Sequence, residues 1–308
     1  AVSGALFHSG HVIGDGVDLY GTFWFFWWIG DCIVNFRDPS FTDLMFYPLG
    51  KDIFAHTGNN FVDAVLAQPF RWIFGFPRYQ PWFVLFLLVG NALCFVPLAR
   101  SVFQSRAAVW SATCLWMLNP FVLFELMCGR LTQALLWFMP LAIWQFREIG
   151  RSQQARWSWS WWQPMILAGL CTGLQGWTYW FGGYFLALGL GVLAAAEVSD
   201  LVRERRWDWE LVGRWAIAGL VCAAVVAPGA WAMATAQAAS SVPGVGGEVG
   251  SIFEPPQALA NNVSASLHGY VLQETKGQPM LGYWVWGGGL VACIIWGRGQ
   301  RRWLALSL

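Results

Sequence analysis

The stretch PWFVLFLLVGNALCFVPL, residues 81–98, contains no charged side chain. A helix of about 17–25 apolar residues is long enough to cross the hydrocarbon core of a bilayer. The stretch therefore predicts a membrane-spanning helix over 82–98. The composition of the chain agrees with this environment, because 57% of its 308 residues are hydrophobic, 11% are charged and 23 are tryptophan. This is not the composition of a soluble domain, and we expect lipid to surround most of the chain.

Six more segments have few charges and a similar length. They cover residues 107–126, 131–146, 165–181, 183–198, 215–234 and 280–297. We therefore expect an all-α membrane protein, a polytopic helical bundle with two extracytoplasmic loops, of which the first carries interfacial helices.

The predicted spans divide the chain into five regions. Residues 1–13 resemble the end of a first membrane helix, 14–80 form an extracytoplasmic loop with two surface helices, and 81–234 form a six-span membrane bundle. Residues 235–279 are predicted as a second extracytoplasmic loop, and 280–308 as a last span and the start of a further one. We expect the sequence to be a piece of a longer protein, because RRWLALSL at its end resembles the first turn of another apolar segment.

The connections between the spans alternate in charge. One set carries most of the arginines, and positively charged connections favour the cytoplasmic side of a membrane. These arginines are Arg100, Arg106, Arg147, Arg151, Arg156, Arg203, Arg205, Arg206, Arg214, Arg298, Arg301 and Arg302. The other set holds most of the acidic residues and is predicted to face the opposite side.

The first exterior region is too long to be a simple turn. We expect an aromatic helix over 21–35, and a second helix over 61–74 that begins at Asn60 as its N-cap. The aromatic helix is short for a span, and tryptophan and phenylalanine favour the headgroup boundary. It is therefore predicted to lie along the membrane surface.

Two carboxylates immediately precede this aromatic helix, in GDGVDLYGTFWFFWWIGD, residues 14–31. Asp15 and Asp18 follow the point where the chain is expected to leave the bilayer, and apolar residues come directly after them. A carboxylate near a water-excluding surface can act as a general base, so we predict that at least one of the pair is catalytic. The alternative is a hydrated helix terminus. For Asp38, Asp52 and Asp63, ordinary solvated loop acids are the preferred interpretation.

Other ionisable and aromatic residues on the same side are candidates for substrate binding. Lys51 and His56 lie in a turn-rich stretch and could contact a phosphate or a sugar hydroxyl, although ordinary loop residues have the same appearance. Glu125, Arg130 and Gln133 lie at the boundary of two spans, where Glu125 and Arg130 form either a structural ion pair or an anionic-headgroup site. Tyr179 lies in the turn GWTYWFGGY, residues 176–184, and could stack on a sugar ring or belong to an interfacial aromatic belt.

Metal, disulfide and nucleic-acid patterns are weak. The seven cysteines contain no Cys-x-x-Cys pair and no Cys/His metal spacing, so they are predicted to be small core residues. The net charge is +1 and no basic stripe is interleaved with aromatic residues, so no nucleic-acid partner is expected.

The arrangement resembles the GT-C superfamily of membrane glycosyltransferases, in particular its uncharacterised bacterial branch. The segments that carry the resemblance are DLYGTFWFFWW, FYPLGKDIFAHTGNN and NPFVLFELMCGRLTQ, together with the closing GQPMLGYWVWGGG. Its spacing of two acids, Asp-x-x-Asp, differs from the tighter acidic pair of many members.

The resemblance implies transfer of a sugar from a polyprenyl-phosphate donor to a glycan, lipid or protein acceptor on the extracytoplasmic side. Asp15 or Asp18 would deprotonate or orient the acceptor hydroxyl. Arg130, with Lys51 or His56, would offset charge on the departing phosphate. The sequence specifies no cofactor; two carboxylates are compatible with a divalent metal, but their spacing does not demand one. The expected location is a bacterial inner membrane, with membrane lipid as a partner.

Two other classes stay open. A transporter usually needs ionisable groups or broken helices near the bilayer midplane, and the predicted spans from Trp82 onward carry no charge near their centres. Pro120, Pro140 and Pro228 nevertheless permit irregular helices. A noncatalytic polytopic membrane protein would keep the fold and leave Asp15 and Asp18 dispensable.

Overall fold

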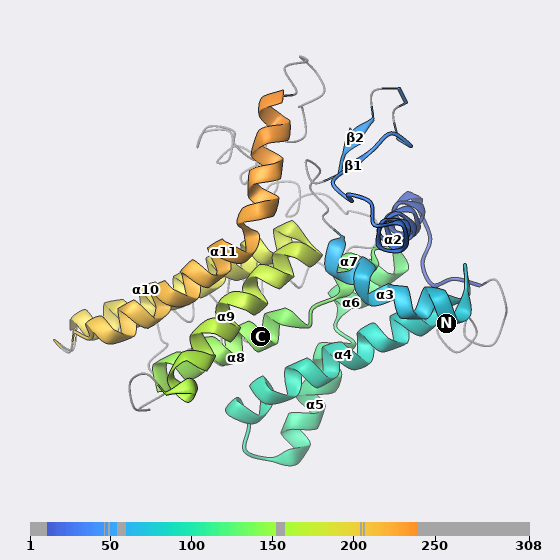
Figure 1. Cartoon of the computed structure of the whole chain (residues 1–308). Helices are drawn as coiled ribbons and strands as arrows, with labels where there is room; N and C mark the ends of the chain where they lie inside the picture. The colour runs from blue at the N-terminus through green and yellow to red at the C-terminus, as the bar shows by residue number, and fades with distance from the viewer. Residues whose placement is uncertain are drawn as a thin grey trace, which may run out of the picture. The chain divides into compact units, whose positions relative to one another are not determined.

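The computed structural model of the chain describes residues 11–45, 47–48, 50–53, 60–151, 158–203, 205 and 207–239. This part of the chain is mostly helical, with a short antiparallel hairpin (Figure 1). Contacts divide the chain into a unit over Ala1–Ala236 and a second unit over Gln237–Leu308. The predicted span over 280–297 and nearly all of the predicted loop over 235–279 lie outside the described residues.

The helices and strands follow one another in a simple order along the chain. They are α2 (Val17–Asn35), β1 (Phe41–Thr42), β2 (Lys51–Asp52), α3 (Phe61–Phe74), α4 (Tyr79–Val102), α5 (Arg106–Met117), α6 (Pro120–Met127), α7 (Leu131–Ala134), α8 (Phe138–Arg151), α9 (Trp159–Thr178), α10 (Trp180–Arg203) and α11 (Trp209–Ala239).

Four helical stretches of the described chain are long and apolar enough to cross a membrane. They are Tyr79–Val102, Arg106–Met127, Trp180–Arg203 and Trp209–Thr235. Each contains one of the predicted spans, so the prediction of a helical membrane protein is confirmed at this level. The predicted span over 165–181 falls mainly within α9, which is helical for 20 residues but is not one of the four.

The second of these stretches is divided into two helices that are capped separately. Ser105 begins α5, and its hydroxyl accepts a hydrogen bond from the Ala108 backbone N–H at 3.1 Å. Asn119 has an extended backbone and begins α6, where its Oδ1 accepts from the Val122 N–H at 2.9 Å. Pro120 at the first position of α6 cannot continue α5, because it has no N–H to donate.

The predicted span over 131–146 is not a single helix. The structure divides it between the four-residue helix α7, a non-helical stretch over 135–137, and the start of α8. The apolar sequence suggested a continuous helix, but side chains of neighbouring helices satisfy the backbone groups of this stretch instead. We call residues 130–137 the buried segment, because Leu131, Ala134 and Leu135 within it have no exposed surface.

Side chains from two other helices bind the backbone of the buried segment. Asn91 of α4 donates from Nδ2 to the Ala134 carbonyl, and its Oδ1 accepts from the Leu136 N–H, both at 2.9 Å. Gln175 of α9 donates to the Leu135 carbonyl at 3.1 Å. Because buried backbone polar groups need partners, these amides make the non-helical conformation tolerable in an apolar interior.

The helices of the first exterior region were predicted with different accuracy. The structure has α3 over the predicted range 61–74, but Asn60 makes no side-chain cap and has a left-handed backbone. The aromatic helix begins at Val17 rather than at residue 21. Its Phe26 and Ile29 are fully buried, whereas Tyr20 is 74% exposed, so only one face of α2 is free of protein contacts.

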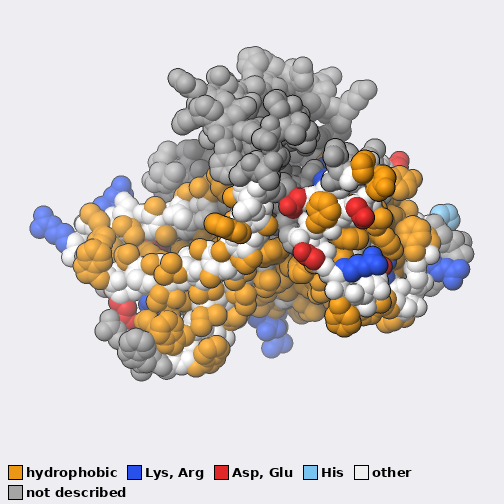
Figure 2. Space-filling model, turned by 45° about the horizontal axis from the view of Figure 1, so that its top comes forward, with side chains coloured by type: hydrophobic (Ala, Val, Ile, Leu, Met, Phe, Trp, Pro, Cys, Tyr) orange, Lys and Arg blue, Asp and Glu red, His pale blue; other side chains and the backbone are white. Residues whose placement is uncertain are grey.

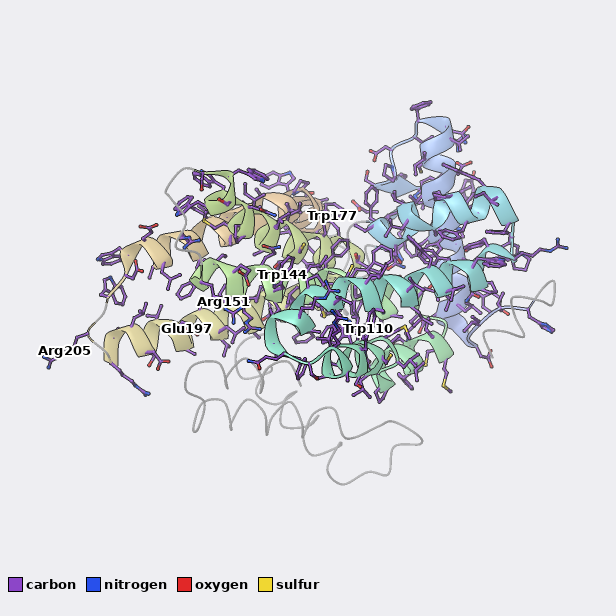
Figure 3. All side chains as sticks on the ribbon, turned by 90° about the horizontal axis from the view of Figure 1, so that it is seen from below. Trp110, Trp144, Arg151, Trp177, Glu197 and Arg205 are labelled. Carbon is purple, nitrogen blue, oxygen red and sulfur yellow. The ribbon has the colours of Figure 1, made fainter. Side chains whose placement is uncertain are left out.

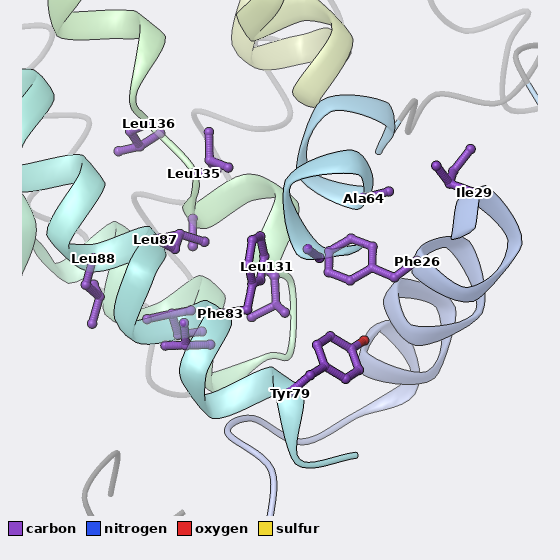
Figure 4. Packing of buried hydrophobic residues seen from close by; sticks show 14 of the residues in the cluster. Phe26, Ile29, Ala64, Tyr79, Phe83, Leu87, Leu88, Leu131, Leu135 and Leu136 are labelled. Atoms are coloured by element: carbon purple, nitrogen blue, oxygen red, sulfur yellow. The ribbon is translucent and has the colours of Figure 1, made fainter. Parts of the chain in front are cut away.

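The main core forms where α2, α3, α4 and the buried segment meet. In the close-up of Figure 4, Leu131 lies among Phe26, Phe83 and Ala64, which come from three different helices. Tyr79 at the start of α4 also packs here, with its ring 6.5 Å from that of Phe26. The first exterior region is therefore packed onto a candidate span and does not hang from it as a loop.

Small residues let α9 approach its neighbours closely. A side chain at Gly169 would collide with the α11 backbone at Ala218, and one at Gly183 of α10 would collide with Gly176. Trp177, labelled in Figure 3, donates from its indole N–H to the Val225 carbonyl of α11 at 2.8 Å. Close backbone approach through glycine is common where helices pack in membranes.

We predict that Asn91→Ala lowers the free energy of unfolding by about 2–4 kcal/mol, because it leaves the Ala134 carbonyl and the Leu136 N–H buried without partners. The measurement is equilibrium unfolding of the full-length protein in lipid bicelles. The control is Asn35→Ala, which removes an exposed amide bonded to Asp31 and is expected to change stability by less than about 0.5 kcal/mol. Equal effects of the two substitutions would contradict the prediction.

Candidate functional site

A guanidinium group lies between two carboxylates beside the start of α2. Nε of Arg130 donates a hydrogen bond to Oδ2 of Asp18 at 2.6 Å. Its Nη1 lies 3.5 Å from Oε2 of Glu125, which is within ion-pair distance but long for a hydrogen bond. Asp18 and Arg130 are 112 positions apart in the sequence, so only folding brings them together. We call Asp18, Glu125 and Arg130 the charged cluster.

The two acids of the charged cluster have different surroundings. The side chain of Asp18 is 56% exposed, whereas that of Glu125 is 6% exposed. An exposed ion pair contributes little to stability, but a buried carboxylate that loses its cation is strongly destabilising. Arg130 is therefore structurally necessary to Glu125, while its bond to Asp18 can be exchanged at low energetic cost. That bond is the main cause that raises the pKa of Arg130, which stays a cation.

The turn between α6 and α7 places Arg130. Helix α6 ends at Met127, and the Cys128 N–H still donates to the Phe124 carbonyl at 3.0 Å. Gly129 has a φ of +74°, which reverses the chain. The Arg130 N–H then donates to the Glu125 carbonyl at 2.8 Å, so the same residue that pairs with the Arg130 side chain also fixes its backbone.

The segment before α2 is bound to this turn. The Asp15 N–H donates to the Met127 carbonyl at 2.8 Å, and the Thr22 hydroxyl donates to the Gly129 carbonyl at 3.3 Å. Gly14 has a φ of +98°, and a Cβ there would lie 2.5 Å from the Leu126 carbonyl oxygen. These contacts fix Asp15 and Asp18 beside Arg130, and they explain why a glycine precedes the acids.

Asp15 is exposed and is not part of the charged cluster. Its Oδ1 accepts a hydrogen bond from the Gly16 N–H at 2.7 Å. Its backbone is bonded to Met127, so Asp15 lies next to the α6–α7 turn. The predicted pair is thus divided into an acid that binds Arg130 and an acid that faces solvent.

Tyr179 and Gln133 lie near the charged cluster, Tyr179 through its side chain and Gln133 through its backbone. Tyr179 ends α9, and its ring interacts electrostatically with both Glu125 and Arg130. The Gln133 backbone N–H donates to the Arg130 carbonyl at 3.2 Å. The structure therefore brings together Asp18, Glu125, Arg130 and Tyr179, as four of the predicted site residues, and uses Gln133 in the backbone of the turn.

The two remaining predicted ligands are Lys51 and His56. Lys51 lies on β2, where its register partner is Thr42 of β1. His56 lies outside the described residues. On the face shown in Figure 2, apolar side chains cover most of the described surface, and a few acidic and basic side chains stand among them.

Asp63 was predicted to be a solvated loop acid, and this is wrong. It is completely buried, and its Oδ2 accepts a hydrogen bond from the Thr132 hydroxyl of the buried segment at 2.6 Å. Burial raises the pKa of Asp63 to about 7, although the bond from Thr132 acts in the opposite direction. One signal could have revealed it: Asp63 shares a helical face with Ala64 and Ala67, the small buried residues of α3.

Within the described part of the chain, no three or more His, Cys, Asp or Glu side chains come together in a way that could hold a metal ion. The cysteines described there are free thiols, and Cys32 and Cys171 are buried. The charged cluster consists of one cation, Arg130, and two carboxylates, Asp18 and Glu125.

Comparison with models of protein families, with curated proteins and with solved structures gives no match to this chain.

We predict that Gly129→Ala lowers the free energy of unfolding by about 2–4 kcal/mol, because the new Cβ adds a steric clash to an unfavourable positive φ. The clash is with Leu19 of α2, whose Cβ would lie only 2.5 Å away. The control is Gly75→Ala, which also has a positive φ but meets no atom within 4 Å. Equilibrium unfolding measures both; a loss at residue 129 no larger than that at residue 75 would argue against tight contact between α2 and the turn.

Proposed function

We propose that this protein is a membrane glycosyltransferase that moves a sugar from a polyprenyl-phosphate donor to an extracytoplasmic acceptor. The observation that carries the proposal is the 2.6 Å bond between Arg130 and Asp18 at the end of a candidate span. A phosphate needs a fixed cation, an acceptor hydroxyl needs a carboxylate, and a prenyl chain needs an apolar surface. All three occur within one short stretch of structure.

The two aspartates are assigned different roles. A general base needs a carboxylate oxygen that can reach the acceptor hydroxyl, and Oδ2 of Asp18 is already bonded to Arg130. We therefore assign the base to Asp15, which is exposed and lies beside the turn. Asp18 orients Arg130 and gives way when a phosphate oxygen replaces it, an exchange that its exposure makes inexpensive.

The proposed step balances as follows. Asp15 accepts the proton of the acceptor hydroxyl, and that oxygen forms a bond to the anomeric carbon of the sugar. The bond between the anomeric carbon and the phosphate oxygen breaks, and its electron pair leaves with the polyprenyl phosphate. Arg130 offsets the negative charge that grows on the departing oxygen. Tyr179 is the aromatic surface nearest to Arg130 among the predicted ligands and would contact the sugar ring.

We infer that the site lies at the extracytoplasmic membrane surface. The end of α3 and the turn after it expose Trp72, Ile73 and Phe76, and candidate span α4 begins three residues after Phe76. The ring of Phe74 stacks on Trp82 of α4 at 5.1 Å. Exposed aromatic residues beside the first turn of a span favour the headgroup layer. The arginine-rich connections would then be cytoplasmic, in a bacterial inner membrane.

Transport and a noncatalytic role are the alternatives. The divided stretch Arg106–Met127 and the non-helical part of the buried segment are irregularities of the kind that transporters use. Against this, the charged cluster lies at the end of a candidate span and not at its middle, where a coupling site is expected.

The test offers polyprenyl-phosphate sugars and a crude acceptor extract to the complete protein in lipid. Asp15→Asn is expected to slow transfer about 10²–10⁴-fold, as loss of a general base does. Arg130→Gln is expected to slow it about 10²–10³-fold. The matched control is Asp31→Asn, which also breaks an exposed aspartate–arginine pair on α2, with Arg37, and should leave the rate within about twofold of wild type.

Each result decides between the alternatives. Transfer that is lost in folded Asp15→Asn and retained in Asp31→Asn supports both the enzyme and the site. Equal transfer by all variants would keep the enzyme and remove the assignment to Asp15 and Arg130. Absence of transfer with every donor would favour the transporter or the noncatalytic protein.

A further inference from the structure

Asp63 is a buried carboxyl group that has no role in the proposed sugar transfer. It lies in the first turn of α3 with no exposed surface. Its Oδ2 is bonded to Thr132, and its Oδ1 has no hydrogen-bonding partner among the described residues. Burying a carboxyl group with half of its bonding capacity unused is unfavourable. A stability role alone would be met better by an apolar side chain of the same size.

The only side chain that binds Asp63 in the described structure belongs to the helix that begins at Arg130. Thr132 is the second residue of α7, and Arg130 is its N-cap. The Arg130 carbonyl accepts from the N–H groups of Gln133 and Ala134 at 3.2 and 3.3 Å. Residues 130–134 therefore move as one turn, and a displacement of Thr132 displaces Arg130. Ala64 and Leu131, the residues next to Asp63 and Thr132, belong to the same buried cluster and are labelled in Figure 4.

We propose that Asp63 is a positioning residue for Arg130: through its bond to Thr132 it fixes the α7 turn, and the protonation state of its carboxyl group sets how firmly that turn is held. This inference depends on the proposed function in one respect only, which is that Arg130 binds an anionic ligand. The coupling from α3 to α7 stands on the contacts alone.

Burial is the main cause of the raised pKa of Asp63, and the charged and titratable groups near it contribute less. From α4 it faces Tyr79, with which it interacts electrostatically. Arg71 of its own helix is bonded to the Phe26 carbonyl and to Gln68. The elements packed against α3 carry Asp18 and Asp31 on α2, Arg130 at the start of α7, and Tyr179 at the end of α9; among the described residues none of these forms an ion pair with Asp63.

The direction of the pH effect follows from the raised pKa of about 7. An unfolded aspartate has a pKa of about 3.9, so between about pH 4 and pH 7 the folded protein binds a proton that the unfolded chain has lost. The stability that this proton contributes is complete below about pH 4 and is lost as the pH rises through 7. Above that value a carboxylate is held in an apolar site, and the α7 turn is the element expected to loosen.

The experiment follows hydrogen–deuterium exchange of the amides of residues 131–136 in the full-length protein in lipid. Wild type and Asp63→Asn are compared at each of several pH values between about 5 and 9, which cancels the intrinsic pH dependence of exchange. We expect exchange in wild type, relative to Asp63→Asn, to become faster as the pH rises from about 5 to about 7 and to level off at about tenfold above about pH 7, because only wild type loses the stability that the buried proton contributes. Asp43→Asn, an exposed acid on the hairpin, is the control and should follow wild type.

A second variant tests the hydrogen bond itself. Thr132→Val keeps the side-chain shape and removes the hydroxyl, and it is expected to speed exchange of the same amides up to about tenfold even at low pH. Thr132→Ser, which keeps the hydroxyl, should follow wild type. Parallel exchange of wild type and Asp63→Asn at every pH, or wild-type exchange in Thr132→Val, would overturn the proposal; should Asp63→Asn not fold, the two threonine variants decide it.

Phosphate binding separates this inference from the proposed function. The same samples are titrated with a polyprenyl phosphate, and wild type and Asp63→Asn are compared at the same pH, because the ligand loses its own second proton at about pH 6. The affinity of wild type relative to that of Asp63→Asn is expected to fall as the pH rises to about 7. A protein that binds no polyprenyl phosphate but shows the predicted exchange would refute the proposed function and leave the coupling of Asp63 to α7 intact. A protein that binds polyprenyl phosphate but whose exchange is the same in wild type and Asp63→Asn would refute the coupling of Asp63 to α7 and leave the proposed function intact.

Discussion

A stretch of backbone that is buried without forming a regular helix is the constraint on which the rest of this structure depends. Residues 130–137 lie among α2, α3, α4 and α9, and much of their backbone makes no helical hydrogen bond. Their polar groups are satisfied by Asn91 and Gln175, and Thr132 is bonded to Asp63. Irregular backbone is tolerated within a membrane protein only where protein or water covers it. The surrounding helices must therefore carry amide and carboxyl side chains at fixed positions, and this requirement accounts for most of the buried polar residues near the site.

This constraint also explains why the charged groups lie where they do. The segment begins at Arg130, whose backbone is fixed by Glu125 and whose side chain reaches Asp18. The Asp15 N–H, just before α2, bonds to the Met127 carbonyl, and the Thr22 hydroxyl of α2 bonds to the Gly129 carbonyl. These hydrogen bonds hold two regions that are far apart in the sequence together beside the ion pair of Asp18 and Arg130. The site has a rigid half, made by α6 and α7, and an exposed half, made by Asp15 and Asp18.

The elements that could be predicted from the sequence are those governed by local patterns. Runs of apolar residues are long enough to identify α4, α10 and α11, and α3 was placed over 61–74. Local sequence patterns did not predict the structure where contacts between distant residues determine it. Residues 131–146 are mostly apolar and carry no charge, and nothing in their own sequence shows that Asn91 will bind their backbone groups. Glu125 and Arg130 were expected to form either an ion pair or an anionic-headgroup site. The bond from Arg130 to Asp18 could not be predicted, because it depends on a packing contact across 112 positions. Asp63 was misjudged because it stands next to a polar turn, although its helical face is lined with alanine.

The separate caps of α5 and α6 have a mechanical consequence. A continuous membrane helix transmits a change of tilt along its whole length, and bilayers of different thickness impose different tilts. Here the two halves meet at Leu118 and Asn119, and each half begins with its own cap at Ser105 or Asn119. Helix α5 can therefore change its angle as lipid composition varies without breaking hydrogen bonds of α6. The hydrogen bonds that hold Glu125 and the turn after it are therefore independent of those within α5.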